Sequence, residues 1–277
     1  MVRRRPMNTR PRARSGGKAR LMMAVVMVAI ALFSFLSSRD VNEITGETQY
    51  ISMTPRQEIA LGLQATPQMI QQYGGLYDDP KVQEYVDTIG HKIVQNSAAA
   101  DSEYQFDFHL LNDPQTINAF ALPGGQIFIT TALYQKFSTE GQLAGVLGHE
   151  IGHVVARHSA QRIAQSELTE GMIGAVVTAS GSAGTAQIAQ MIGQMVNMKY
   201  GRADEIQSDV LGVDFIVDAG YDPRSMISVM QILAGSAGGN RQPEFFSSHP
   251  NPENRIGRIE DAIQNKFPSG VPDGLTE

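Results

Sequence analysis

The segment 148–153, Gly-His-Glu-Ile-Gly-His, constrains this chain more than any other stretch of its sequence. If the segment is helical, His149 and His153 lie one turn apart and about 40° apart around the axis, so both imidazoles can reach one metal ion. Glu150 lies to the side, where its carboxylate can meet a water molecule without taking a coordination position. The spacing therefore predicts a hydrolytic site with one metal ion. The alternative is a surface helix that carries this spacing by chance.

The residues around this segment predict a buried helix. Thr139 and Gln142 form a capping-box pattern that marks its N-terminus. Apolar residues occupy most of its sides, namely Leu143, Val146, Leu147, Ile151, Val154 and Val155. Burying two histidines and a glutamate there without partners would be costly, which favours a bound metal over coincidence.

A third metal ligand must supply nitrogen or oxygen, because the chain contains no cysteine. Glu205 is the best candidate, on a helix predicted to run towards Gly220. Asp209 follows four residues later on the same face, where it can accept a hydrogen bond from a ligand imidazole and fix its tautomer. Asp204 competes as the ligand, but its offset of about 100° points it away from Asp209. Taken alone, these carboxylates fit a solvated acidic face; beside the histidine pair they favour a metal site.

The remaining histidines are weaker candidates. His249 lies in a predicted loop at 245–252, between Ser248 and a proline. There it can donate a hydrogen bond to the oxyanion of a tetrahedral intermediate or bind zinc in a resting state, and a plain loop histidine is the alternative. His91, on a predicted helix, and His109, on the polar side of a predicted strand, are expected to face solvent.

Positive charge is concentrated at the N-terminus. Residues 1–20 hold 8 of the 22 basic residues and no acidic one, which leaves 14 basic against 28 acidic residues and a formal net charge of −14 for the remainder. This balance excludes a general nucleic-acid-binding surface on the globular part, and we expect no nucleic-acid partner.

An apolar stretch follows these basic residues. From Leu21 to Leu36 the chain carries no charge, and only Ser34 is polar. A basic region at 1–20 and an apolar segment at 21–38 are typical of a signal peptide or a short signal anchor, which predicts that the globular part is exported. No clear cleavage site follows, which slightly favours an uncleaved anchor in the membrane. A cytoplasmic nucleic-acid tail would explain the arginines but not the apolar run.

A mostly helical α+β domain is expected over 54–277, joined to the apolar segment by a polar linker at 39–53. Thr54, followed by a proline and by a glutamine three residues on, marks the start of one helix. Asp79, also followed by a proline, marks the start of a second helix that runs to about Asn96.

Two short strands are predicted between the second helix and the histidine-bearing helix. Residues alternate between apolar and polar over 106–110, and a Pro-Gly-Gly turn at 123–125 precedes a strand at 126–130. We expect a small β-sheet beside the helix at 148–153. An edge strand next to a catalytic cleft can bind an extended peptide by backbone pairing, and a plain hairpin that covers the core is the alternative.

The segment 166–199 is rich in glycine, alanine, methionine and glutamine. It predicts two helices joined by a break at 181–184, which could cover the cleft or bind a partner protein.

Four segments in this order resemble one known family. They are Asn118 to Gly125, the histidine pair with Glu150, Glu205 with Asp209, and Ser248-His249-Pro250 with Arg255. From about Thr54 to Lys266, the chain resembles the zinc metallopeptidases that include the CAAX prenyl endopeptidase, HtpX, and the exported bacterial proteases BepA and LoiP.

This resemblance implies a gluzincin-type fold with one zinc ion per chain. The implied zinc ligands are His149, His153 and Glu205, with Glu150 as general base and Asp209, His249 and Arg255 in further catalytic or supporting roles. Because few residues follow the last motif, we expect a single-domain, exported member.

Together with the export signal, the resemblance implies a zinc endopeptidase of the bacterial cell envelope. We expect a periplasmic domain, anchored in the inner membrane or released, that degrades misfolded or misassembled exported proteins. One rival is an envelope-protein chaperone or assembly factor with a zinc-bound but weakly proteolytic site. Another is a hydrolase of non-peptide amides. Glu150 argues against a pure binding module, because a structural zinc site needs no base.

Overall fold

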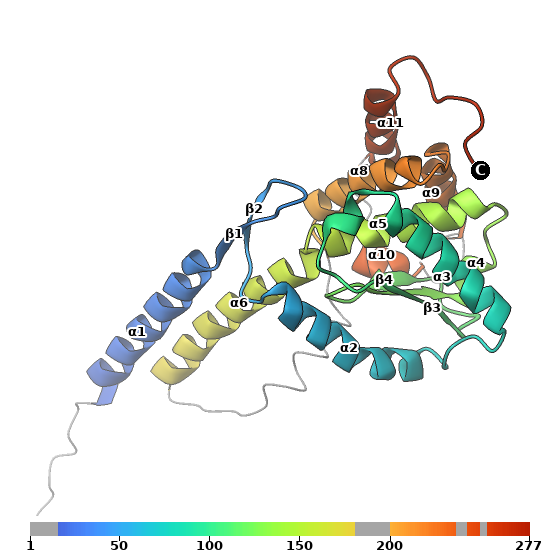
Figure 1. Ribbon diagram of the computed structural model, residues 1–277. Helices are drawn as coiled ribbons and strands as arrows, with labels where there is room; N and C mark the ends of the chain where they lie inside the picture. The colour runs from blue at the N-terminus through green and yellow to red at the C-terminus, as the bar shows by residue number, and fades with distance from the viewer. Residues whose placement is uncertain (1–15, 181–199, 237–242, 250–253) are drawn as a thin grey trace, which may run out of the picture.

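Helices pack around one three-stranded sheet in the part of the chain that the structure describes (Figure 1). This computed structural model describes residues 16–180, 200–236, 243–249 and 254–277. The elements in chain order are α1 (Gly16–Ser37), β1 (Arg39–Val41), β2 (Thr48–Tyr50), α2 (Pro55–Gln72), α3 (Pro80–Gln95), the 3₁₀ helix η1 (Ala98–Asp101), β3 (Asp107–Leu111), β4 (Ala119–Ala121), β5 (Gln126–Thr130), α4 (Thr131–Tyr134), α5 (Glu140–Val155), α6 (His158–Ser180), α8 (Arg202–Asp218), α9 (Arg224–Ser236), α10 (Phe245–Ser248) and α11 (Arg255–Lys266). The prediction of a mostly helical α+β fold is confirmed.

Helices α2 and α3 begin where the N-cap residues Thr54 and Asp79 predicted. Thr54 Oγ1 accepts a hydrogen bond from the Gln57 backbone N–H, and the Gln57 side chain accepts one from the Thr54 N–H, so α2 begins with a complete capping box. At the start of α3, the Asp79 side chain accepts a hydrogen bond from the Lys81 N–H. This helix ends at Gln95, close to its predicted end.

The sheet has the strand order β3-β5-β4. β3 is parallel to β5, whereas β4 pairs with β5 antiparallel through the turn at 123–125. Gly124 and Gly125 have φ angles of +83° and +112°, which glycine adopts without the clash that a Cβ would cause. Both predicted strands are present, but they pair in parallel and so form no hairpin with each other, and β5 is the central strand instead of an edge strand. The hairpin partner of β5 is β4, which was not predicted. β4 lies at the edge of the sheet and contacts α5 and α10.

Helices cover both faces of the sheet. Phe108 packs on one face in a core shared with α3 and α5, and Phe128 packs on the other face with α2. The His109 ring stacks on Phe128 with 4.7 Å between ring centroids, and His109 Nε2 lies 2.9 Å from Gln126 Oε1. The His109 side chain is only 12% exposed. The prediction of a solvent-facing His109 is therefore wrong, because α2 covers the polar side of the strand.

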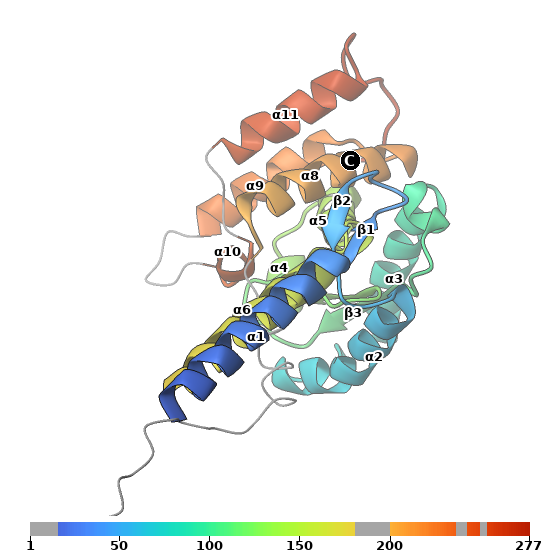
Figure 2. The ribbon, with the colours of Figure 1, turned by 90° about the vertical axis from the view of Figure 1, so that its left-hand side faces the viewer.

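α1 and α6 lie side by side and extend away from the sheet (Figure 1, Figure 2). They approach closely, since a Cβ on Gly171 would lie 2.9 Å from Ala31 Cβ. Large apolar side chains of α1 stay exposed, with Phe33 at 75%. Among the described residues, Gly17–Ser37 is the one helix long and apolar enough to cross a membrane. The signal or anchor at 21–38 stays a prediction.

The first of the two helices predicted over 166–199 begins earlier than expected. α6 starts at His158, directly after α5, and runs to Ser180. The predicted break and the second helix fall on 181–199, which lie outside the described residues.

The polar segment at 39–53, predicted to be a linker, contains the antiparallel hairpin of β1 and β2. Its buried side chains bind the end of α5: Asn42 Nδ2 donates to the Val155 carbonyl at 2.8 Å, and Gln49 Nε2 donates to the Ala156 carbonyl at 2.7 Å. The last carbonyls of a helix have no partner within the helix, so these amides satisfy them. The domain boundaries drawn around this segment stay a prediction.

Arg157 joins the same hairpin to α2. It follows α5 with φ +57°, in the left-handed region. Its guanidinium donates hydrogen bonds of 2.9 Å each to Glu58 Oε1, Asp40 Oδ2 and the Met53 carbonyl. The Glu58 side chain is only 2% exposed, and burial raises the pKa of Glu58 although Arg157 opposes this shift.

Arg157→Ala is expected to lower the free energy of unfolding by about 3–5 kcal/mol, because Glu58 would remain buried without its partner. Urea unfolding of the full chain in detergent, followed by circular dichroism, measures this loss. Adding Glu58→Met removes the stranded charge and should recover part of the stability. Equal losses in the single and double variants would contradict the explanation.

Candidate metal centre

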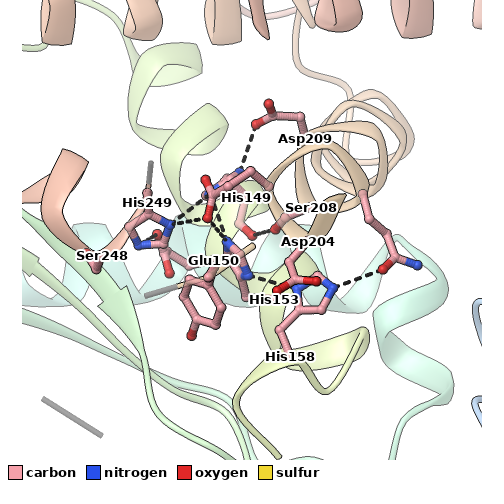
Figure 3. Close-up of polar contacts among 12 residues, drawn as sticks. His149, Glu150, His153, His158, Asp204, Ser208, Asp209, Ser248 and His249 are labelled. Atoms are coloured by element: carbon pink, nitrogen blue, oxygen red, sulfur yellow. Dashed lines mark hydrogen bonds and ion pairs between the residues drawn. The ribbon is translucent and has the colours of Figure 1, made fainter. Parts of the chain in front are cut away.

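Four buried side chains meet where α5, α8 and the end of α10 come together. His149, His153, Glu205 and His249 each offer one donor atom, and these atoms all lie within 4.8 Å of one another. His149 Nε2 lies 3.0 Å from His153 Nε2, and Glu205 Oε1 lies 3.2 Å from His249 Nδ1 and 3.5 Å from His153 Nε2. Figure 3 shows the three imidazoles turned towards one another. The structure thus brings the predicted ligands together and adds His249.

The segment before His249 is helical, whereas a loop was predicted. Residues 245–248 form the short helix α10 instead of a loop, and the Phe245 ring stacks on His249 with 4.4 Å between centroids. His249 itself is fully buried. Burial alone would lower the pKa of His249, but the carboxylates of Glu205 and Glu150 raise it overall. The rest of the predicted loop, 250–253, lies outside the described residues.

Small residues allow α8 to approach α5 closely. A Cβ on Gly152 would lie 2.8 Å from Ser208 Oγ and 2.9 Å from the Ser208 carbonyl oxygen. Ser208 Oγ in turn donates a hydrogen bond to the His149 carbonyl. A larger residue at position 152 would push the two helices apart. The glycine between the two histidines therefore lets Glu205 reach them.

Asp209 and Arg255 form a second, fully buried group against the cluster. Asp209 Oδ1 lies 2.9 Å from His149 Nδ1, and Arg255 Nε and Nη2 donate to the two Asp209 oxygens at 2.7 and 2.8 Å. Arg255 Nη1 also lies 3.1 Å from Glu205 Oε2, but the two atoms are not aligned as a hydrogen bond. Burial alone would raise the pKa of Asp209, but Arg255 and His149 lower it to about 2. Asp209 is therefore ionised near neutral pH.

Glu150 lies beside the donors with both carboxylate oxygens buried and without a hydrogen-bond partner. The nearest ionisable contact is His249 Nε2, 3.6 Å from Glu150 Oε1. Burial raises the pKa of Glu150. An unpaired carboxylate in the interior is costly and requires an explanation outside ordinary packing.

The donors and the unpaired atoms fit a bound cation. Besides Glu150, the atoms Glu205 Oε2 and His249 Nε2 are buried without a hydrogen bond. Burial alone would raise the pKa of Glu205, but His249 and His149 lower it overall, so this carboxylate is available as an anion. Imidazole nitrogens with one carboxylate oxygen form a donor set that zinc takes in catalytic sites. The predicted binding of a metal ion is therefore supported by the residues present.

Two residues that the sequence patterns did not single out also contact the cluster. His158 Nδ1 lies 2.8 Å from His153 Nδ1, and the Tyr200 ring stacks on His153 with 4.0 Å between centroids. The available signal for His158 was a third histidine five residues after His153. His91 lies away from the cluster, where it pairs with Asp87.

The family described as peptidase family M48 matches residues 80–263, which is more than half of the chain. The chain belongs to peptidase family M48. The resemblance to zinc metallopeptidases, the gluzincin-type fold and the predicted enzyme class, a metalloendopeptidase, are thereby confirmed.

Relatives of this M48 chain include bacterial and mitochondrial proteins. It is 30% identical over 231 residues to the beta-barrel assembly-enhancing protease of Yersinia pestis, covering 80% of this chain and 47% of that protein. It is 31% identical over 243 residues to the putative beta-barrel assembly-enhancing protease of Vibrio cholerae, covering 84% and 49%. The mitochondrial metalloendopeptidase OMA1 of Arabidopsis thaliana is 33% identical over 149 residues, covering 53% and 29%. The chain spans about half the length of its bacterial relatives.

Proposed function

We propose that this M48 chain is a zinc endopeptidase of the bacterial cell envelope that cleaves misfolded or misassembled exported proteins. The observation that carries the proposal is the buried carboxylate of Glu150, which has no hydrogen-bond partner and lies against a cluster of three imidazoles and a carboxylate. A site that only stabilised the fold would need no such group.

His149, His153 and Glu205 would hold one zinc ion per chain. When bound, zinc would polarise the scissile carbonyl and lower the pKa of a water molecule towards ~7. Side chains of the protein carry out the remaining steps. Glu150 takes a proton from the attacking water and passes it to the nitrogen of the leaving amine. Burial raises the pKa of Glu150, which favours its uptake of the proton.

Asp209 and Arg255 would hold His149 in place. With His149 Nε2 directed at the other donors, its Nδ1–H donates to Asp209 Oδ1 at 2.9 Å, which fixes the tautomer. Arg255 holds Asp209 through two hydrogen bonds and balances its charge.

His249 has two possible roles that its position supports. Its Nδ1 lies among the donors, so it can serve as a further ligand at rest. Its Nε2 carries no hydrogen bond, and so it can donate one to the oxyanion that develops during peptide cleavage. In either role it acts at the reacting atoms.

Peptide substrates would bind beside the edge strand β4. This strand contacts α5, which carries Glu150, and α10, which leads to His249. A strand with a free edge can hold an extended peptide by backbone hydrogen bonds.

The location and substrates rest on the N-terminus and on the bacterial relatives. The basic region at 1–20 and the apolar helix α1 support export with retention in the inner membrane or release after cleavage. The relatives are named for enhancing the assembly of beta-barrels, which favours envelope proteins as substrates. The net charge of −14 beyond residue 20 speaks against a nucleic-acid partner.

A strain in which Glu150→Gln replaces the wild-type chain tests this function. We expect a set of exported proteins to accumulate in its envelope by quantitative mass spectrometry, because they are no longer cleaved. Glu260→Gln, at an exposed position of α11, is the matched control and should leave the envelope unchanged. A normal envelope in the Glu150→Gln strain, with a disturbed envelope only when the whole chain is deleted, would instead favour a chaperone or assembly factor.

A further inference from the structure

His158 connects the metal centre to α8, through a buried contact with His153 and a partly buried contact with Gln207. Its Nδ1 lies 2.8 Å from His153 Nδ1, and its Nε2 lies 2.9 Å from Gln207 Oε1. His158 is 1% exposed. Figure 3 shows His158 on the side of His153 that faces away from His149 and His249. Both nitrogens of this ring are therefore engaged, one with His153 and one with α8.

These contacts allow one arrangement of protons when His153 binds a metal through Nε2, as in the proposed function. His153 Nε2 is the nitrogen that faces the other donors, 3.0 Å from His149 Nε2. A ligand nitrogen carries no proton, so the proton of a neutral His153 must be on Nδ1. His153 Nδ1–H then donates to His158 Nδ1, which must be unprotonated. The His158 proton is left on Nε2, where it donates to the Gln207 carbonyl oxygen.

We propose that His158 and Gln207 form an uncharged relay that holds His153 in its metal-binding tautomer, with His158 as a positioning residue. With its oxygen turned towards His158, as in the structure, Gln207 accepts the proton on His158 Nε2 and so favours the tautomer whose Nδ1 accepts from His153. This relay is the counterpart of Asp209, which contacts His149. One ligand histidine is thus supported by a carboxylate and the other by a neutral ring.

The surroundings of His153 hold its ring in one orientation. Ser159, the residue after His158, shares a hydrogen bond of 2.9 Å with the Tyr200 hydroxyl. The Tyr200 ring stacks on His153 with an angle of 21° between the planes. His153 is therefore confined by stacking on one face and by the relay at its edge, which leaves its Nε2 directed at the other donors.

The relay is tested by zinc affinity, measured by competition with a chromophoric chelator on the full chain in detergent. His158→Leu keeps much of the ring's volume but removes the acceptor, and it should weaken zinc binding by about 10–100-fold, the usual effect of losing a partner of a ligand histidine. His158→Asn places an amide oxygen near the position of Nδ1 and should restore much of the affinity. In Co²⁺-loaded protein, the visible absorption bands should change in His158→Leu and return towards wild type in His158→Asn.

Position 207 provides a test that leaves His158 intact. Gln207→Ala should weaken zinc binding, whereas Gln207→Glu should bind zinc at least as tightly as wild type, because a carboxylate acceptor makes the relay and its ligand more basic. If His158→Leu fails to fold, as judged by circular dichroism of the metal-free chain, this pair decides the question.

These outcomes distinguish a failure of the relay from a failure of the proposed function on which it rests. Wild-type affinity and cobalt spectra in His158→Leu, or equal affinities in Gln207→Ala and Gln207→Glu, would overturn the relay alone. If wild type and Glu205→Ala bind zinc equally weakly, the proposed zinc site fails and the relay fails with it.

Discussion

Glu150→Gln is expected to slow cleavage of casein by about 10²–10⁴-fold, the range lost when a general base is removed. The glutamine amide has nearly the shape of the carboxylate but cannot take a proton from water. Since neither Glu150 oxygen has a hydrogen-bond partner, the change breaks no hydrogen bond of the fold. Zinc content, measured by inductively coupled plasma mass spectrometry, should therefore equal that of wild type.

For this prediction to hold, casein cleavage must fall while the zinc content stays at the wild-type level. Loss of activity together with loss of zinc would show that Glu150 supports the metal site instead of the proton transfer. Retained turnover of casein by the zinc-loaded variant would refute the assignment of Glu150 as the base.

Glu205→Ala is expected to weaken zinc binding by more than about 100-fold, beyond the 10–100-fold that loss of an outer partner causes. Glu205 is the carboxylate that lies within 3.5 Å of both His153 Nε2 and His249 Nδ1, so its removal takes the only anionic oxygen from the donor cluster. Zinc per purified chain, and the residual zinc after dialysis against a chelator, measure the effect.

Asp204→Ala is the matched control, because Asp204 is the adjacent carboxylate on α8 and contacts Arg162 and the Gly201 N–H, away from the cluster. It should keep full zinc occupancy. Full zinc occupancy in Glu205→Ala as well would show that a residue other than Glu205 is the third ligand.

The features that could be predicted from the sequence are those set by local spacing. His149 and His153 share a helix face because four residues make about one turn, and Asp209 follows Glu205 for the same reason. The cap at Thr54 was predictable because both of its hydrogen bonds join residues three apart in the chain. The position of Arg255 came from family resemblance alone, since no spacing relates it to Asp209, 46 residues away.

The predictions failed where contacts join distant parts of the chain. His109 was expected to face solvent because its own strand alternates, and nothing in that strand shows that α2 covers it. The segment 39–53 was expected to be a linker because it is polar, and its composition does not show that Asn42 donates a hydrogen bond to the Val155 carbonyl, 113 residues away. The contacts of His158 were missed for the same reason, since Gln207 lies 49 residues away.

The hairpin that binds the end of α5 has a consequence for substrate choice. Only Ser38 separates α1 from β1, and Asn42 holds the last turn of the helix that carries the metal ligands. If α1 stays in the bilayer as an uncleaved anchor, this short connection keeps the metal centre close to the membrane surface. Proteins held at or emerging from the membrane would then meet the site far more often than proteins that diffuse freely through the surrounding compartment.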